Sequence, residues 1–225
     1  MKSKSVQAWR ALVILALVMG FVLFASAGTL RYWHAWVYLS IFFTASGLTT
    51  LYLIRNDAAL LERRMKGGPM AEKRPVQRLI MLCTSIGFVG LLVVPALDHR
   101  FGWSSVSFVT VAAGDVLVAV GLSLIFLVYR ENTFTSATIE VASDQRLIST
   151  GPYAIVRHPM YASASLYLFG TPLALGSYWG LVPLAATMPF LLWRLVDEER
   201  LLSRALPGYV EYQQRVRFRL VPFLW

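Results

Sequence analysis

Charged residues and cysteines are scarce in this chain of 225 residues. Asp, Glu, Lys and Arg make up 15% of it, whereas soluble domains carry about 25%. Hydrophobic residues account for 57%, and they come in long runs rather than at amphipathic spacing. This pattern argues against a soluble domain and predicts an integral membrane protein. The single cysteine, Cys83, excludes an intrachain disulfide and a metal site built from several cysteines.

Several motifs of common enzyme classes are also absent. The sequence has no GxGxxG or GxxxxGK[ST] glycine loop, no HExxH zinc motif and no GxSxG nucleophile turn. Metalloprotease and serine hydrolase functions therefore have no support, and we expect no metal. The net charge of +9 does not indicate nucleic acid binding. The basic residues fall between apolar runs, and no soluble domain is visible to present them.

The apolar runs predict an all-α fold, a polytopic transmembrane bundle of about five or six spans. Four spans are expected at residues 11–27, 35–54, 79–97 and 104–129. Residues 25–27 also resemble a signal-peptide cleavage site, but we expect the first run to be a span. Two further runs, 162–175 and 178–196, are joined by residues rich in Gly and Pro. The first of these runs is too short to cross a bilayer alone, so we predict a helical hairpin.

Polar segments separate these runs, and their charges predict the orientation. Residues 55–78 carry seven basic side chains, and residues 57–66 are expected to form an amphipathic surface helix that ends at the following Gly-Gly-Pro. With six passes and a cytoplasmic N-terminus, all but Arg31 and Arg100 of the 21 Lys and Arg residues lie in cytoplasmic segments. Both termini are therefore expected in the cytoplasm. The membrane is expected to be a bacterial inner membrane or its equivalent.

Two polar clusters fall on this predicted cytoplasmic side. The first is GPYAIVRHPMY at residues 151–161, and the second is Asp197-Glu198-Glu199-Arg200. Pro159 disfavours helix at His158 and suits the first turn of a following helix, where backbone N–H groups favour an anion. An interfacial anchor would contain the same residue types, so the residues alone leave anchor and binding site open. Asp115 lies inside the fourth run, where we expect a structural pairing.

The two clusters together resemble those of the integral membrane methyltransferases. GPYAIVRHPMY, then a hydrophobic hairpin, Glu198-Glu199 and the tail YVEYQQRVRFRLVP are similar to isoprenylcysteine carboxyl methyltransferase and the phospholipid N-methyltransferases. The resemblance covers residues 130–225. It implies S-adenosylmethionine as methyl donor, held in a cytoplasm-facing pocket formed by the last spans and the tail. It also implies a lipophilic acceptor that enters from the bilayer, either an isoprenylcysteine-like carboxylate or a lipid amine.

The resemblance also implies roles for residues and regions. Residues 130–225 would form the methyltransferase core, and residues 1–129 a four-span membrane region on the acceptor side. Glu198 would act as a base for an amine acceptor, and Arg215 or Arg217 would orient a carboxylate acceptor. The predicted cofactor-binding residues are Gly151, Tyr153, Arg157, His158, Pro159, Tyr161, Glu198 and Glu199. Two alternatives remain: a sterol-reductase-like enzyme that uses NADPH, and a non-catalytic membrane scaffold. Membrane lipids are expected partners in every case.

Overall fold

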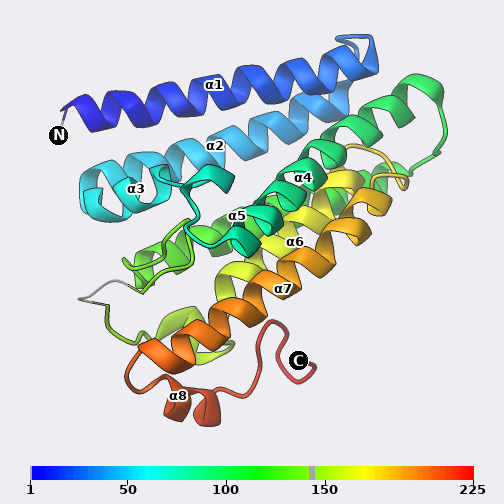
Figure 1. The fold of residues 1–225 in the computed structure, drawn as a ribbon. Coiled ribbons are helices and arrows are strands. Elements are labelled where there is room, and N and C mark those ends of the chain that lie inside the picture. The colour runs from blue at the N-terminus through cyan, green and yellow to red at the C-terminus, as the bar shows by residue number, and fades with distance from the viewer. Residues whose placement is uncertain (1, 142–144) are drawn as a thin grey trace.

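A computed structural model describes residues 2–141 and 145–225, and all regular structure in these ranges is helical (Figure 1). The all-α prediction is therefore confirmed. The elements in chain order are α1 (Lys2–Ala27), α2 (Trp33–Asn56), α3 (Ala58–Met65), the 3₁₀ turn η1 (Pro69–Ala71), α4 (Pro75–Phe101), α5 (Phe108–Glu131), the 3₁₀ turn η2 (Gly151–Ala154), α6 (Pro159–Ala174), α7 (Leu181–Ala205) and α8 (Tyr209–Arg215).

In the described part of the chain, four helices are long and apolar enough to cross a membrane: α1, α2, α4 and α5. They coincide with the four predicted N-terminal spans. The α6 helix has 16 residues and is about 24 Å long at 1.5 Å per residue, which is less than the roughly 30 Å of a hydrocarbon core. The α7 helix has 25 residues, and most of its charged side chains lie in its last third. Together they form the predicted helical hairpin.

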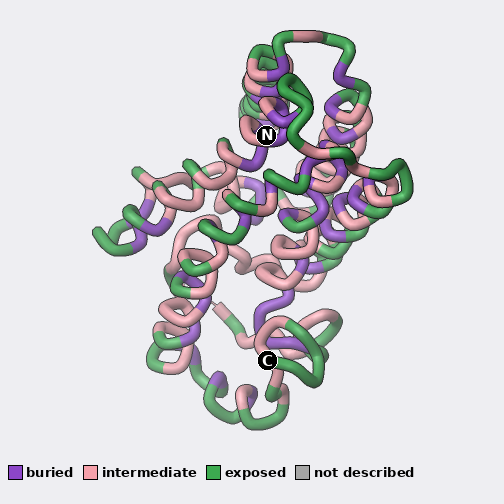
Figure 2. The backbone as a smooth tube through the Cα atoms, turned by 90° about the vertical axis from the view of Figure 1, so that its right-hand side faces the viewer, coloured by how far each residue is buried: buried purple, intermediate pink, exposed green. Residues whose placement is uncertain are grey.

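The helices form one bundle, with α1 and α2 at one edge and α7 at the other (Figure 1). Along most helices, buried positions alternate with exposed ones (Figure 2). The exposed positions include large apolar side chains such as Leu17, Phe21 and Val109, which are 68%, 74% and 75% exposed. Apolar side chains on the outside of a bundle are suited to contact with lipid.

The closest packing is between α5 and α6. It depends on glycines, because a Cβ added at Gly114 would lie 2.3 Å from the backbone nitrogen of Ala174. One added at Gly121 would lie 2.7 Å from the backbone nitrogen of Tyr167. Small residues let two membrane helices approach until their backbones touch. This contact fixes α6, and therefore the polar cluster at its start, against the end of α5.

Polar contacts close one end of the bundle. Asp98, only 1% exposed, accepts hydrogen bonds from the Ser104 backbone nitrogen and hydroxyl, both at 2.6 Å, and from the Ser177 hydroxyl. Asp98 thereby joins the end of α4 to the α4–α5 link and the α6–α7 turn. The Tyr32 hydroxyl donates to the Leu175 carbonyl at 2.5 Å, which ties the α1–α2 turn to the same place.

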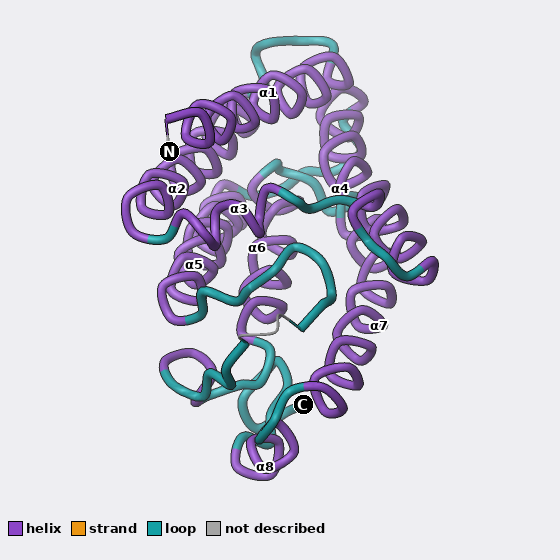
Figure 3. The backbone as a smooth tube through the Cα atoms, turned by 60° about the vertical axis from the view of Figure 1, so that its left-hand side comes forward, coloured by secondary structure: helices purple, strands orange, loops and turns teal. Residues whose placement is uncertain are grey.

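The opposite end holds both long polar segments and both predicted clusters. Helix α3 forms where the amphipathic helix was predicted and ends before Gly67-Gly68. Arg63 donates to the Thr133 carbonyl at 2.6 Å, and Arg74 pairs with Asp197 at 2.6 Å. The loop after α5 runs from α5 toward α7 (Figure 3). The helix order thus brings the two clusters to the same end of the molecule, as the charge pattern predicted.

Candidate functional site

A cavity of about 390 Å³ lies at this end, between α4, α5, α6, α7, α8 and the loop after α5. Its volume is within the range of small-molecule sites. One part of its wall is apolar and lies among the membrane helices, with Met81, Ile125, Ala164 and Leu191. The other part is polar and carries Arg157, His158, Tyr161, Arg194 and Glu198. A molecule in this cavity would meet both surfaces.

The 151–161 motif forms a turn followed by a helix start. Gly151 has φ +55°, a left-handed conformation that glycine tolerates best. A Cβ there would also lie 2.9 Å from the Glu131 carboxyl carbon, so the turn packs directly on the end of α5. Pro159 is the first residue of α6 and His158 precedes it, as the sequence predicted. His158 is only 4% exposed, and its Nε2 atom has no hydrogen-bond partner in the described structure.

The C-terminal tail is pinned alongside this motif. The backbone nitrogens of Arg157 and His158 donate to the carbonyls of Phe218 and Arg219 at 2.8 and 3.0 Å. The Arg157 guanidinium donates to two further tail carbonyls, those of Val216 and Arg217, each at 3.0 Å. These bonds satisfy backbone groups that would otherwise be orphaned in a partly buried segment. The tail is therefore part of the structure that holds the motif.

Glu199 connects the motif, α7 and the tail. Its carboxylate accepts from Arg157 Nε and from Arg219 Nε, both at 2.8 Å, and lies 3.6 Å from His158 Nε2. Burial raises the pKa of Glu199, but interactions with His158, Arg219 and Arg157 outweigh burial and lower the pKa to about 2. Glu199 is thus a charged, buried centre of an ion-pair network.

Glu198 is the next residue back along α7, yet it has different surroundings. It is half-buried and lines the cavity, and its carboxylate accepts a hydrogen bond from the Tyr161 hydroxyl at 2.5 Å. Consecutive residues on an α-helix point about 100° apart, so only one of two adjacent carboxylates can face the same neighbour. Glu198 faces the cavity, and Glu199 faces the tail.

The structure brings most of the predicted site residues together. Gly151, Glu199 and Arg215 are not among the described residues on the cavity wall. Gly151 shapes the turn, Glu199 holds the network behind the wall, and Arg215 is exposed at the end of α8. This geometry does not favour the predicted catalytic role of Arg215. The predicted residues that line the cavity are Tyr153, Arg157, His158, Pro159, Tyr161 and Glu198.

Sequence analysis missed three residues at this site. Arg219 pairs with Glu199, but Arg215 and Arg217 precede it at alternate positions, so residue type alone could not single it out. Asn132 donates to the Tyr153 hydroxyl at 2.9 Å from the loop after α5. Arg194 lies on the wall, four residues before Glu198. That spacing indicates that the arginine can offset the charge of Glu198 on one helix face, but it does not indicate that both side chains line a cavity.

Asp115 differs from the expectation of a structural pairing. Its Oδ1 atom is buried in α5 and has no hydrogen-bond partner in the described ranges.

The residues that the structure describes also contain no group of three His, Cys, Asp or Glu side chains that could hold a metal ion.

Comparison with known proteins places the site within a matched region. Residues 109–207 match the model of the phospholipid methyltransferase family. This range runs from α5 through α7 and contains both polar clusters, so the predicted resemblance to integral membrane methyltransferases is confirmed over residues 130–207. The match also takes in most of α5, whereas the tail after residue 207 lies outside it. A solved structure of the eukaryotic intramembrane Ras methyltransferase, isoprenylcysteine carboxyl methyltransferase, is 17% identical. That comparison covers 99% of this chain and 97% of the other, with a TM-score of 0.36. No curated protein matches the sequence at a significant level.

Proposed function

We propose that the chain is a membrane methyltransferase that uses S-adenosylmethionine and methylates a lipophilic acceptor at the cytoplasmic face. One observation carries the proposal. The 151–161 motif and Glu198 line a single cavity, and both lie in the range that matches phospholipid methyltransferases. The division into an acceptor-side region, residues 1–129, and a methyltransferase core, residues 130–225, is part of the same proposal.

The polar wall fits the groups that S-adenosylmethionine carries. The cofactor supplies a methyl group activated by a sulfonium cation. Glu198 can accept hydrogen bonds from an ammonium or from ribose hydroxyls. His158 offers a buried Nε2 atom that makes no hydrogen bond in the described structure and lies 3.6 Å from the Glu199 carboxylate, and Tyr161 presents an aromatic ring that suits a cation. A buried polar atom that lacks a partner is costly unless a ligand supplies one.

The apolar wall fits a lipophilic acceptor. Met81, Ile125 and Leu191 continue the cavity between helices that are expected to lie in the membrane. An acceptor chain there would bring its head group toward Glu198. A carboxylate acceptor is already ionised and needs no base. An amine acceptor must lose a proton, and Glu198 can take it. In either case the protein's main contribution is to align acceptor and donor.

Calorimetric titration of the purified chain in detergent tests this function. We expect S-adenosylmethionine and S-adenosylhomocysteine to bind and NADPH not to bind. His158→Ala should weaken binding of S-adenosylmethionine and S-adenosylhomocysteine. Arg215→Ala should leave their binding unchanged because Arg215 does not line the cavity. Absence of binding at millimolar concentration would overturn the proposal. Binding of NADPH in place of the two methionine-derived ligands would favour the reductase.

A further inference from the structure

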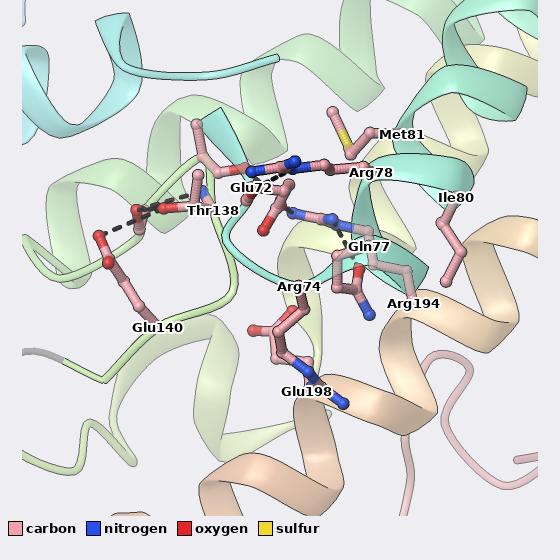
Figure 4. A network of polar contacts seen from close by, with 12 residues as sticks. Glu72, Arg74, Gln77, Arg78, Ile80, Met81, Thr138, Glu140, Arg194 and Glu198 are labelled. Carbon is pink, nitrogen blue, oxygen red and sulfur yellow. Dashed lines mark hydrogen bonds and ion pairs between the residues drawn. The ribbon is translucent and has the colours of Figure 1, made fainter. Parts of the chain in front are cut away.

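Arg194 is held at the cavity wall by residues from the N-terminal half of the chain (Figure 4). It is 8% exposed. Its guanidinium donates to the Gln77 side-chain oxygen at 2.9 Å and to the Ala137 carbonyl at 3.0 Å, and it lies 2.7 Å from Glu72 Oε1. A guanidinium has five N–H groups. The hydrogen bonds to Gln77 and Ala137 use two of them, whereas the contact with Glu72 is an ion pair in which Oε1 makes no hydrogen bond in the described structure. The other N–H groups are available to the Tyr161 hydroxyl, which also interacts with Arg194, and to a molecule in the cavity.

The two residues that hold Arg194 are themselves buried and fixed. Glu72 is 2% exposed and Gln77 is 0% exposed. The Glu72 carbonyl accepts from Arg78 Nε at 2.7 Å, and the Gln77 amide donates to Asp197 at 2.5 Å. Both residues precede the range that matches the phospholipid methyltransferases. A buried carboxylate with so little exposure is costly unless it is paired, so the pairing with Arg194 is not incidental.

The position of Arg194 relative to Glu198 gives this arrangement a chemical consequence. The two residues are four apart on α7, a spacing at which an arginine and a glutamate are neighbours on one helix face and can form an ion pair. In the described structure they do not pair, because Glu72 holds Arg194 and Tyr161 holds Glu198. The cavity is therefore offered a cation and an anion side by side. Such a pair matches a ligand that carries an ammonium and an anionic oxygen a few bonds apart.

We propose that Glu72 and Gln77 are positioning residues that hold Arg194 apart from Glu198, so that the Arg194–Glu198 pair binds a zwitterionic head group. The inference rests on the proposed function, which supplies two sources of that chemistry. One is the amino-acid end of S-adenosylmethionine, and the other is an ethanolamine lipid head group. The N-terminal half of the chain then takes part in substrate binding as well as in membrane insertion.

The test compares two soluble ligands that differ in the amino-acid group. S-adenosylhomocysteine carries it, and 5′-methylthioadenosine lacks it. In Glu72→Gln, Arg194 is no longer held apart from Glu198. We therefore expect S-adenosylhomocysteine to bind about tenfold more weakly or worse, because the charge-assisted contact between its amino-acid group and the Arg194–Glu198 pair is lost. Binding of 5′-methylthioadenosine should change less than about twofold. A second arm measures methyl transfer to vesicles of phosphatidylethanolamine, where a higher KM with unchanged S-adenosylhomocysteine binding assigns the zwitterion to the lipid.

A matched control distinguishes a specific effect on Arg194 from a general loss of contact between the segment before α4 and α7. Arg74→Gln breaks an ion pair with Asp197 that joins the same two segments, but Arg74 does not line the cavity. We expect it to change neither ligand's affinity. Equal losses in Arg74→Gln and Glu72→Gln would overturn the inference, as would equal loss of both ligands in Glu72→Gln. Unchanged binding of both ligands together with unchanged lipid transfer would also overturn it.

A second variant covers the case in which Glu72→Gln fails to fold. The double substitution Glu72→Gln with Arg194→Gln leaves no buried charge unpaired at this site, and it should lose S-adenosylhomocysteine binding selectively. If the unaltered chain binds neither soluble ligand, the proposed function fails and the inference fails with it. If the unaltered chain binds them and the variants show neither selectivity between the two ligands nor a higher KM for the lipid, only the inference fails.

Discussion

Glu199→Gln removes the negative charge at the centre of the network that joins the 151–161 motif to the C-terminal tail. The substitution keeps the size of the side chain but leaves Arg157 with no carboxylate partner. Arg157 and Glu199 have side chains only 7% and 8% exposed, so the arginine cannot regain full hydration. Arg219, at 33% exposed, can turn toward water and contributes less. The main cost is therefore the uncompensated Arg157.

The expected loss follows from this burial. Breaking a buried ion pair by removal of one partner costs about 3–5 kcal/mol. Since the amide of glutamine can still accept one hydrogen bond, we expect about 3 kcal/mol. For a chain of this size that corresponds to a fall of about 6–12 °C in the unfolding temperature. Glu198→Gln is the matched control, because it changes the adjacent carboxylate and affects one hydrogen bond to Tyr161, worth about 0.5–1.5 kcal/mol.

Thermal unfolding of the purified variants in the same detergent measures the difference. Calorimetric titration with S-adenosylhomocysteine on the same samples shows the second contrast. Glu199→Gln should lower stability strongly, whereas Glu198→Gln should mainly weaken ligand binding. If the two variants lose the same stability and the same affinity, the assignment of separate roles to the two carboxylates is refuted.

Two further predictions concern packing and pH. Gly121→Ala should lower the free energy of unfolding by about 1–3 kcal/mol, because the added Cβ meets the α6 backbone at 2.7 Å. Gly20→Ala is the control, since a Cβ there has no neighbour within 4 Å. It should be neutral or raise the free energy of unfolding by up to about 1 kcal/mol. The Glu199 pKa is lowered to about 2, so its stabilisation is present above its ordinary pKa of 4.5 and is lost as pH falls toward 2. The unfolding-temperature difference between the unaltered chain and Glu199→Gln should therefore be constant from pH 7 to about 5 and shrink below that.

Both predictions have clear contradicting results. A Gly121→Ala chain that unfolds at the same temperature as the unaltered chain would mean that α5 and α6 are not in backbone contact. A stability difference for Glu199→Gln that persists unchanged down to pH 3 would mean that the carboxylate does not titrate in the predicted range.

The cavity links the two halves of the chain in a way that helix packing alone would not require. Its polar wall comes mainly from α6, α7 and the motif before them, while its apolar wall includes Met81 of α4. Under the proposed function, a donor site in the C-terminal half and an acceptor path between membrane helices would meet at Glu198.

The sequence by itself determined the four long N-terminal helices, α3, the α6–α7 hairpin and their order, but not α8, which forms in the segment expected only as a polar tail. Long apolar runs predicted the four N-terminal spans, and Gly67-Gly68-Pro69 predicted the end of α3. The Pro and Gly residues near 172–183 predicted the hairpin of α6 and α7. These features are local, because the length of an apolar run, the fixed φ of proline and the freedom of glycine act within a few residues. The charge pattern added that both polar clusters share one end of the bundle.

Only the tertiary structure decided which polar side chains face each other. Glu198 and Glu199 are identical in type and adjacent, yet one lines the cavity and the other binds Arg157 and Arg219. Their roles depend on how α7 is rotated about its axis relative to α4, α6 and the tail. Contacts between segments distant in the sequence fix that rotation. The same holds for Glu72, whose partner Arg194 is more than a hundred residues away. A local pattern specifies where a helix begins and ends, whereas the direction of each side chain is fixed by what packs against that helix.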